Sequence, residues 1–146
     1  MRVVLDNNIL ARAPAGPDGP AGELLARLQP PHLLIISSVM LQELSEVLFY
    51  ERVRRIHGLD DSAIQDYLQH IQAAALVVTL PTQGIPRVVP HDEDDDVVIA
   101  TAVAAQAEVI GTRDRHLLHP DVIAYCSQRG IEIVGDVQLL ERLRSG

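Results

Sequence analysis

Short apolar runs alternate with longer stretches of helical spacing along this chain, and the alternation predicts its elements. The apolar runs are typical of strands and cover residues 2–5, 33–36, 76–80, 108–112 and 131–134. The helical spacing between them predicts helices over 23–28, from Ser37 or Ser38 to about Tyr50, from Asp60 or Asp61 onward, over 97–107 and over 137–143. Strands that alternate with helices indicate a parallel sheet with helices on both faces.

The chain shows no internal repeat and no linker, so we expect a single domain over residues 1–146. Two segments rich in proline and glycine, 14–22 and 81–90, are predicted to be loops. Apolar residues make up 47% of the chain, which argues against disorder and allows a sizeable core. The expected fold class is therefore α/β, with four to five mostly parallel strands.

Acidic residues follow or flank the predicted strands. Asp6 closes the first strand, Glu43 lies one turn into the helix after the second, and Asp114 follows the strand at 108–112. A run of five acids, 92–96, precedes the alanine-rich helix. Open parallel sheets bind ligands outside the carboxyl ends of their strands, where these side chains would gather. Two carboxylates 4 Å apart repel each other by roughly 1 kcal/mol in water, unless a cation lies between them. Carboxylate oxygens are suitable ligands for Mg²⁺ or Mn²⁺, so the pattern predicts a metal site.

The acidic run imitates another kind of metal site only in part. Asp92, Asp94 and Asp96 have the spacing of the first half of a calcium-binding EF-hand loop. The position that requires glycine holds Val97, and the position of the terminal glutamate holds Val103. The EF-hand interpretation therefore fails, and one or two of these acids are expected to cap the helix while others face the crevice.

The charge of the chain limits its chemistry. A net charge of −8 argues against a broad basic surface for nucleic acid, although bound metal would neutralise several acids. All 12 basic side chains are arginine, and the absence of lysine excludes Schiff-base chemistry and a P-loop. A phosphoacceptor receiver domain also needs a lysine. A haloacid-dehalogenase-like phosphatase needs a second aspartate after the first strand, where this chain has Asn8.

Arginine can still hold phosphate groups through paired hydrogen bonds. Arg113 and Arg115 flank Asp114 and are candidate phosphate contacts, as is His91. Solvated surface charge is expected of the densest cluster, which consists of Arg52, Arg54 and Arg55. Thr112 is expected to support Asp114 through its hydroxyl. His116 and His119 could be metal ligands, but no other feature suggests a zinc site, and turn or packing roles are expected for both.

Several features favour a cytoplasmic protein. A single cysteine, Cys126, excludes an intrachain disulfide and fits a reducing compartment. The first apolar run ends at Asp6, so it does not have the form of a signal peptide. No apolar run approaches the 18 or so residues that span a bilayer, and we expect no membrane association.

Four segments together resemble the PIN domain. They are Val-Val-Leu-Asp-Asn-Asn at 3–8, Glu43 within Ser-Ser-Val-Met-Leu-Gln-Glu-Leu, the stretch from Asp92 to Ala102, and Gly-Thr-Arg-Asp at 111–114. More narrowly, the chain is similar to PIN-family toxin components of toxin–antitoxin systems. The resemblance implies a three-layer α/β/α fold and a Mg²⁺- or Mn²⁺-dependent endoribonuclease. It also implies RNA as the substrate, a small antitoxin as a partner, and a homodimer.

Matching the family's motifs to this chain assigns each of the family's four acids to one residue. It implies catalytic and metal-binding roles for Asp6, Glu43, Asp95 and Asp114. The choice of Asp95 rests on aligning the segment around Ala100, and Asp96 or Asp92 can take its place. The candidates for substrate binding are Arg113, Arg115, Asn8 and Thr112.

Two positions depart from the family pattern. Asn7 stands where the family usually has threonine or serine, so the hydroxyl that would support Asp6 is lost. Glu93 replaces the usual proline, which affects loop stiffness. Asn7 motivates an alternative function, a non-catalytic PIN-like module that binds RNA or protein.

Overall fold

The structure of the protein is a computed structural model, and it describes residues 1–81, 83–90 and 92–146. The strands are β1 (Arg2–Leu5), β2 (Leu33–Ser37), β3 (Leu76–Val78), β4 (Val109–Thr112) and β5 (Glu132–Gly135). The α-helices are α1 (Asn7–Arg12), α2 (Pro20–Arg27), α3 (Ser38–Val47), α4 (Glu51–His57), α5 (Asp61–Ala74), α6 (Glu93–Ala104), α7 (Pro120–Ser127) and α8 (Asp136–Ser145). A 3₁₀ turn, η1 (Ala13–Ala15), follows α1.

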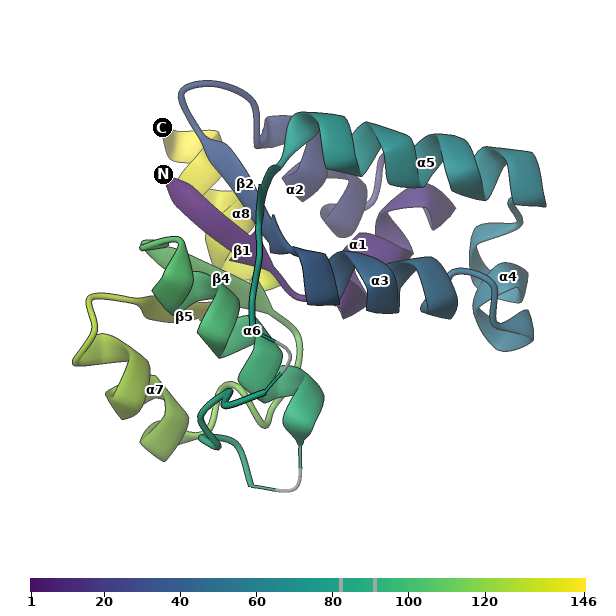
Figure 1. The fold of residues 1–146 in the computed structure, drawn as a ribbon. Helices are drawn as coiled ribbons and strands as arrows, with labels where there is room; N and C mark the ends of the chain where they lie inside the picture. Colours follow the sequence, from purple (N-terminus) through teal and green to yellow (C-terminus); the bar gives the residue numbers. More distant parts are fainter. Residues whose placement is uncertain (82, 91) are drawn as a thin grey trace.

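The described strands form one sheet in the order β3-β2-β1-β4-β5, and every pairing is parallel. From β1 the chain moves outward through β2 to β3, and then returns to place β4 on the other side of β1. The switch point therefore lies between β1 and β4, where the crevice outside the strand ends is expected to bind ligands. The sheet and its helices confirm the predicted α/β/α class (Figure 1).

Helices cover both faces of the sheet. On one face α6 packs across β1, β2 and β4, and α7 packs against β5. On the other face α8 packs against β4, β5 and α2. Helices α3, α4 and α5 lie to the right of the sheet in Figure 1, beyond the end at which β1 and β2 finish.

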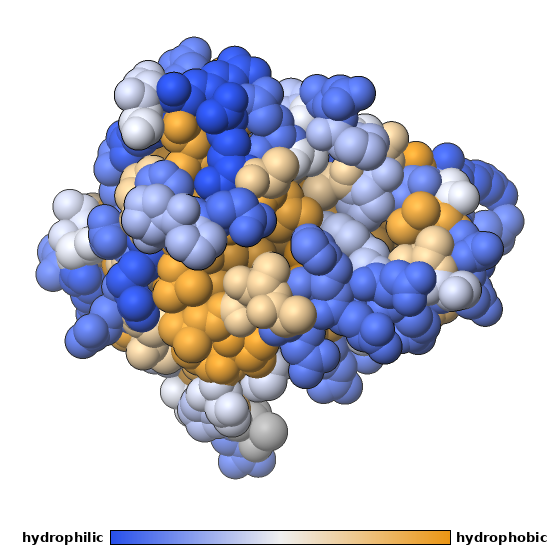
Figure 2. Space-filling model, turned by 90° about the horizontal axis from the view of Figure 1, so that it is seen from above, coloured by the Kyte–Doolittle hydropathy of each residue, from blue (hydrophilic) through white to orange (hydrophobic). Residues whose placement is uncertain are grey.

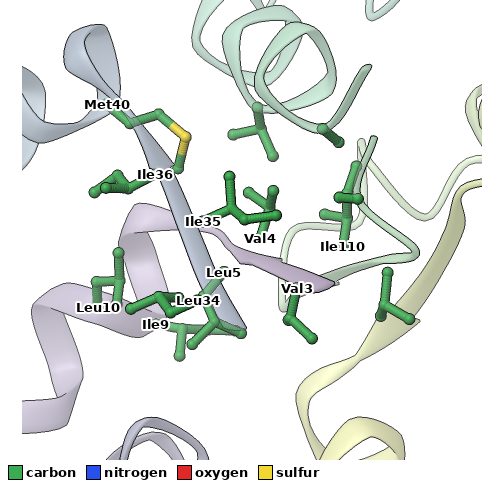
Figure 3. Packing of buried hydrophobic residues seen from close by; sticks show 14 of the residues in the cluster. Val3, Val4, Leu5, Ile9, Leu10, Leu34, Ile35, Ile36, Met40 and Ile110 are labelled. Atoms are coloured by element: carbon green, nitrogen blue, oxygen red, sulfur yellow. The ribbon is translucent and has the colours of Figure 1, made fainter. Parts of the chain in front are cut away.

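The core is built from the alternating side chains of the central strands. Val4 pairs with Ile35 on one side and with Ile110 on the other, and all three point toward the same face (Figure 3). Gly111, the next residue of β4, lies against α8, where an added Cβ would be 2.7 Å from the side chain of Leu139. Both faces of β4 are thus packed, as expected for a central strand of a parallel sheet.

Three short helices were not predicted from the sequence: α1, α4 and α7. The predicted helix to about Tyr50 instead ends at Val47, and α4 begins at Glu51. Helix α2 begins earlier than predicted, with Pro20 in its first turn, where the missing N–H of proline does no harm. Helix α6 begins at Glu93 rather than at residue 97, so four residues of the acidic run form its first turn.

The surface combines charged and apolar areas. Figure 2 shows hydrophilic residues around an apolar area near the centre of one face. An apolar hollow of about 210 Å³ lies between α6 and the segment that follows β3, and its wall includes Leu80, Ile85 and Val103. Among the described residues, no helix is both long and apolar enough to cross a bilayer.

Candidate metal centre

An acidic cavity of about 480 Å³ opens where α3 and α6 approach the ends of β1 and β4. Its wall is formed by Asp6, Asn7, Asn8, Glu43, Glu46, Val47, Tyr50, Asp92, Asp94, Asp95, Val98 and Asp114. The four acids predicted from the sequence, Asp6, Glu43, Asp95 and Asp114, therefore all line one cavity. Whether they bind metal and catalyse a reaction stays a prediction.

Asp6 is fixed by hydrogen bonds at the end of β1. It caps the N-terminus of α1, where its Oδ1 accepts the backbone N–H of Asn8 at 3.0 Å. Its Oδ2 accepts the hydroxyl of Thr112 at 2.8 Å. Burial raises the pKa of Asp6, the hydrogen bonds from Asn8 and Thr112 oppose that rise, and the nearby carboxylate of Asp114 adds to it. The result is a buried, well-oriented carboxylate at the floor of the cavity.

Asn7 does not take the place of the missing hydroxyl. Its Nδ2 donates to the carbonyl of Met40 at 2.9 Å, which ties the start of α1 to α3. Its Oδ1 is buried and meets no hydrogen-bond donor among the described residues. The support that Asp6 would lose at this position comes from Thr112 in β4 instead.

Asp114 is positioned by the same threonine. The Thr112 hydroxyl accepts the backbone N–H of Asp114 at 2.9 Å, so one side chain links two acids of the cavity. Asp114 in turn accepts the backbone N–H of His116 at its Oδ1, at 2.8 Å. Thr112 is fully buried, and its contact with substrate stays a prediction, whereas its predicted role in supporting Asp114 agrees with the geometry.

Asp95 is the most buried of the three acids of the 92–96 run that line the cavity. It is 4% exposed, and its Oδ2 is buried without a hydrogen-bond donor among the described residues. Burial, followed by the neighbouring carboxyls of Asp92 and Asp114, raises the pKa of Asp95 to about 9. A carboxyl in this setting keeps its proton at neutral pH unless a cation replaces it.

Asp96 has a structural role. Its Oδ1 accepts the backbone N–H groups of Val88 and Val89, both at 2.7 Å, and its Oδ2 accepts Arg87 Nε at 2.7 Å. These bonds anchor the segment before α6 to its first turn. Asp96 does not line the cavity, so it is a poor alternative to Asp95 as the fourth acid.

Glu43 lies on the opposite wall, on α3, and faces Asp94. Burial, followed by the charge of Asp94 and a hydrogen bond with it, raises the pKa of Glu43 to about 7. Asp94 is exposed and lines the cavity as well. Like charges therefore face each other across the cavity, from Glu43 on α3 and from Asp94 on α6.

Four side chains bring ligand atoms close enough to hold one ion. One atom from each of Asp92, Asp95, Asp114 and His116 lies within 4.8 Å of all the others. Opposite ligands of an octahedral ion are about 4.2 Å apart, so a small contraction would suffice. The unpartnered Oδ2 of Asp95 and the three carboxylates fit a divalent cation. Asp6 and Glu43 line the same cavity but are not members of this group.

The predicted substrate-binding residues lie at different distances from this centre. Asn8 is exposed and lines the cavity. Arg113 is half-exposed and approaches Asp136, with Nε 3.6 Å from Oδ2, and Arg115 is exposed. His91 lies outside the described residues. The surface interpretation of the arginine cluster on α4 fits the ion pairs of Arg54 with Asp61 and of Arg55 with Glu51.

Sequence reasoning missed some residues of the cavity wall. Glu46 enters it because α3 runs along the cavity and places it about one turn beyond Glu43, whereas Tyr50 enters it from the turn between α3 and α4. The helical spacing of Glu43 and Glu46 was a usable signal. His116 does not line the cavity wall, and the sequence left it as a possible ligand; its place beside the acids depends on the turn in which its backbone N–H donates to Asp114.

Comparisons with known proteins agree with this fold. A family model described as a PIN domain matches residues 2–116. A PilT N-terminus domain protein from the hyperthermophilic archaeon Sulfolobus solfataricus P2 has a similar structure, with a TM-score of 0.52 and 16% sequence identity. The match covers 100% of this chain and 96% of that protein, and at this identity it supports the fold alone. None of the curated proteins compared with the chain matches it significantly.

Proposed function

This chain belongs to the PIN-domain family, and from that premise we propose that it is a metal-dependent endoribonuclease. PIN domains are generally nucleases and typically use divalent metals. The observation that carries the proposal is the group of Asp92, Asp95 and Asp114 in one cavity, with a buried carboxylate oxygen that has no donor among the described residues. An acidic pocket of this kind would repel RNA unless a cation were bound.

Different side chains of the cavity would have different roles in hydrolysis. A bound Mg²⁺ or Mn²⁺ would lower the pKa of water and offset charge on the phosphate. Asp95 and Asp114 would hold the cation, with Asp6 at the floor of the cavity kept in place by Thr112. Glu43, on the opposite wall, would complete the site or orient the attacking water as a proton acceptor, a role that suits its raised pKa.

Residues at the rim would hold the RNA strand. Asn8 offers an amide next to the acids, and Arg113 and Arg115 flank Asp114 on exposed positions. Arginine can hold a phosphate through two parallel hydrogen bonds. Phosphate contacts of this kind would orient the RNA backbone without reading base identity.

The test is cleavage of a mixed cellular RNA pool in Mg²⁺ or Mn²⁺ by the wild-type protein. We expect cleavage that EDTA abolishes and that Asp6→Asn and Asp95→Asn reduce by at least about a hundredfold, as loss of preorganised catalytic groups typically does. Asp66→Asn, an exposed carboxylate on α5, is the matched control and should cleave normally. Undiminished cleavage by Asp6→Asn would contradict the assignment, and a folded protein that binds metal without cleaving any RNA would favour the binding-module alternative.

The biological setting is a further part of the proposal. The motif resemblance supports a toxin of a toxin–antitoxin pair that forms a homodimer and is neutralised by a small antitoxin. A basic residue of the antitoxin would be well matched to the acidic cavity. Co-expression with the neighbouring gene followed by purification tests this, and recovery of free monomer alone would count against it.

A further inference from the structure

His116 is placed among the acids of the cavity rather than at an ordinary surface turn. Its Nδ1 lies 3.4 Å from Asp92 Oδ2 and 3.8 Å from Asp114 Oδ1. Its own backbone N–H donates to Asp114 Oδ1 at 2.8 Å, so the turn that carries the imidazole is fixed to a member of the acidic group. The ring is 54% exposed, but its Nδ1 faces the carboxylates.

From this geometry we propose that His116 is a metal ligand and that Nδ1, with one oxygen each from Asp92, Asp95 and Asp114, makes the site prefer Mn²⁺ to Mg²⁺. The proposal rests on the metal dependence in the proposed function and names which ion that function uses. Asp95 supplies the independent observation, because its side chain is 4% exposed and its unpartnered Oδ2 belongs to the same group.

The choice of ion follows from ligand chemistry. Mg²⁺ binds oxygen ligands and keeps several waters, and it gains little from an imidazole nitrogen. Transition ions accept imidazole readily, and their affinity rises from Mn²⁺ through Fe²⁺ and Co²⁺. If His116 instead formed a simple ion pair with the carboxylates, both nitrogens of its imidazolium would carry protons, and neither could bind a metal ion. The two interpretations therefore differ in whether a ring nitrogen is bonded to the metal.

The experiment combines calorimetry with electron paramagnetic resonance on the folded, full-length chain. Mn²⁺ and Mg²⁺ are titrated into wild type, His116→Ala, His91→Ala and Asp95→Asn, and nitrogen modulation of bound Mn²⁺ is recorded for each. We expect nitrogen coupling in wild type and His91→Ala and none in His116→Ala. We also expect His116→Ala to weaken Mn²⁺ binding by about tenfold or more and Mg²⁺ binding by less than about threefold. Circular dichroism confirms that each variant is folded.

The outcomes separate this proposal from the one it rests on. Mn²⁺ binding that depends on Asp95 but shows no nitrogen coupling, or coupling that persists in His116→Ala, overturns the role of His116 and leaves the metal-dependent nuclease standing. Coupling lost in His91→Ala instead assigns the nitrogen to a different histidine and also overturns it. Wild-type protein that binds neither ion overturns both proposals.

Discussion

Asp95 and Asp96 are adjacent in sequence, but their carboxylates meet different surroundings. Asp96 accepts three hydrogen bonds, whereas Asp95 Oδ2 accepts none from the described residues. Because burial and neighbouring acids disfavour the charge on Asp95, we expect Asp95→Asn to raise the free energy of unfolding at pH 9 in EDTA. The same variant should lose Mn²⁺ binding. Urea denaturation and calorimetry measure the two effects, and a clear destabilisation in EDTA would contradict the picture of a strained carboxylate.

Removal of the neighbouring acid should have the opposite effect. Asp96→Ala leaves the N–H groups of Val88 and Val89 without their acceptor and releases Arg87. We expect it to lower the free energy of unfolding by about 1–3 kcal/mol, the usual cost of an unsatisfied buried group. Asp94→Ala, an exposed change in the same turn, is the control and should not destabilise, because it relieves the repulsion on Glu43. Equal losses for both variants would show that Asp96 is not an anchor.

At the scale of single residues, the sequence predicted the candidate site only in part. Asp6 and Asp114 were accessible because each follows a strand, and strand ends meet at one edge of a parallel sheet. The choice between Asp95 and Asp96 depends on where the segment 87–89 passes, which no local pattern encodes. The sequence predicted that Thr112 supports Asp114 alone. Its second hydrogen bond, to Asp6, depends on the pairing of β1 with β4 and joins residues more than a hundred positions apart.

At the scale of elements, α6 couples capping to the candidate metal centre. Asp92 caps the helix by accepting the N–H of Asp95 at its Oδ1, while its Oδ2 faces His116. Asp92→Asn keeps a capping oxygen and loses the charge, so it should retain stability and weaken Mn²⁺ binding. Asp92→Ala loses both, and we expect an additional cost of about 0.5–2 kcal/mol in unfolding free energy. Thermal denaturation beside Mn²⁺ titration separates the two roles, and identical stability of the two variants would show that the cap contributes nothing.

The fold itself was accessible from the apolar pattern, and its shorter helices were not. The predicted strands overlap all the strands that the structure describes. The central strands β1, β2 and β4 are buried, and buried parallel strands are apolar along their whole length, whereas β3 is apolar but exposed at the sheet edge. Helices α1, α4 and α7 have six to eight residues, too few to show a clear period, and they depend on capping and tertiary packing. The acidic run was predicted to precede α6. Because the helix dipole favours acids in a first turn, four residues of the run form the first turn of the helix instead.

At the scale of the whole molecule, the acids of the cavity connect stability to pH. The folded protein holds protons on Glu43 up to about pH 7 and on Asp95 up to about pH 9, whereas the ordinary pKa values are 4.5 and 3.8. Between pH 5 and 9 the folded state binds more protons than the unfolded chain, so the free energy of unfolding falls as pH rises. Denaturation in EDTA should show this decline, and saturating Mn²⁺ should abolish it. A metal-free stability that rises over this range would contradict it.

The acids of the candidate centre are drawn from distant parts of the chain, with Asp6 in the cap of α1 and Asp114 just beyond β4. A ribosome adds roughly 5–20 residues per second, so about 5 to 20 seconds of synthesis separate the two. During that interval the growing chain can form β1 and β2 but has no complete acidic cavity. Any activity that depends on the cavity is therefore silent on the ribosome that makes the protein, and begins only when the turn bearing Asp114 has emerged and folded.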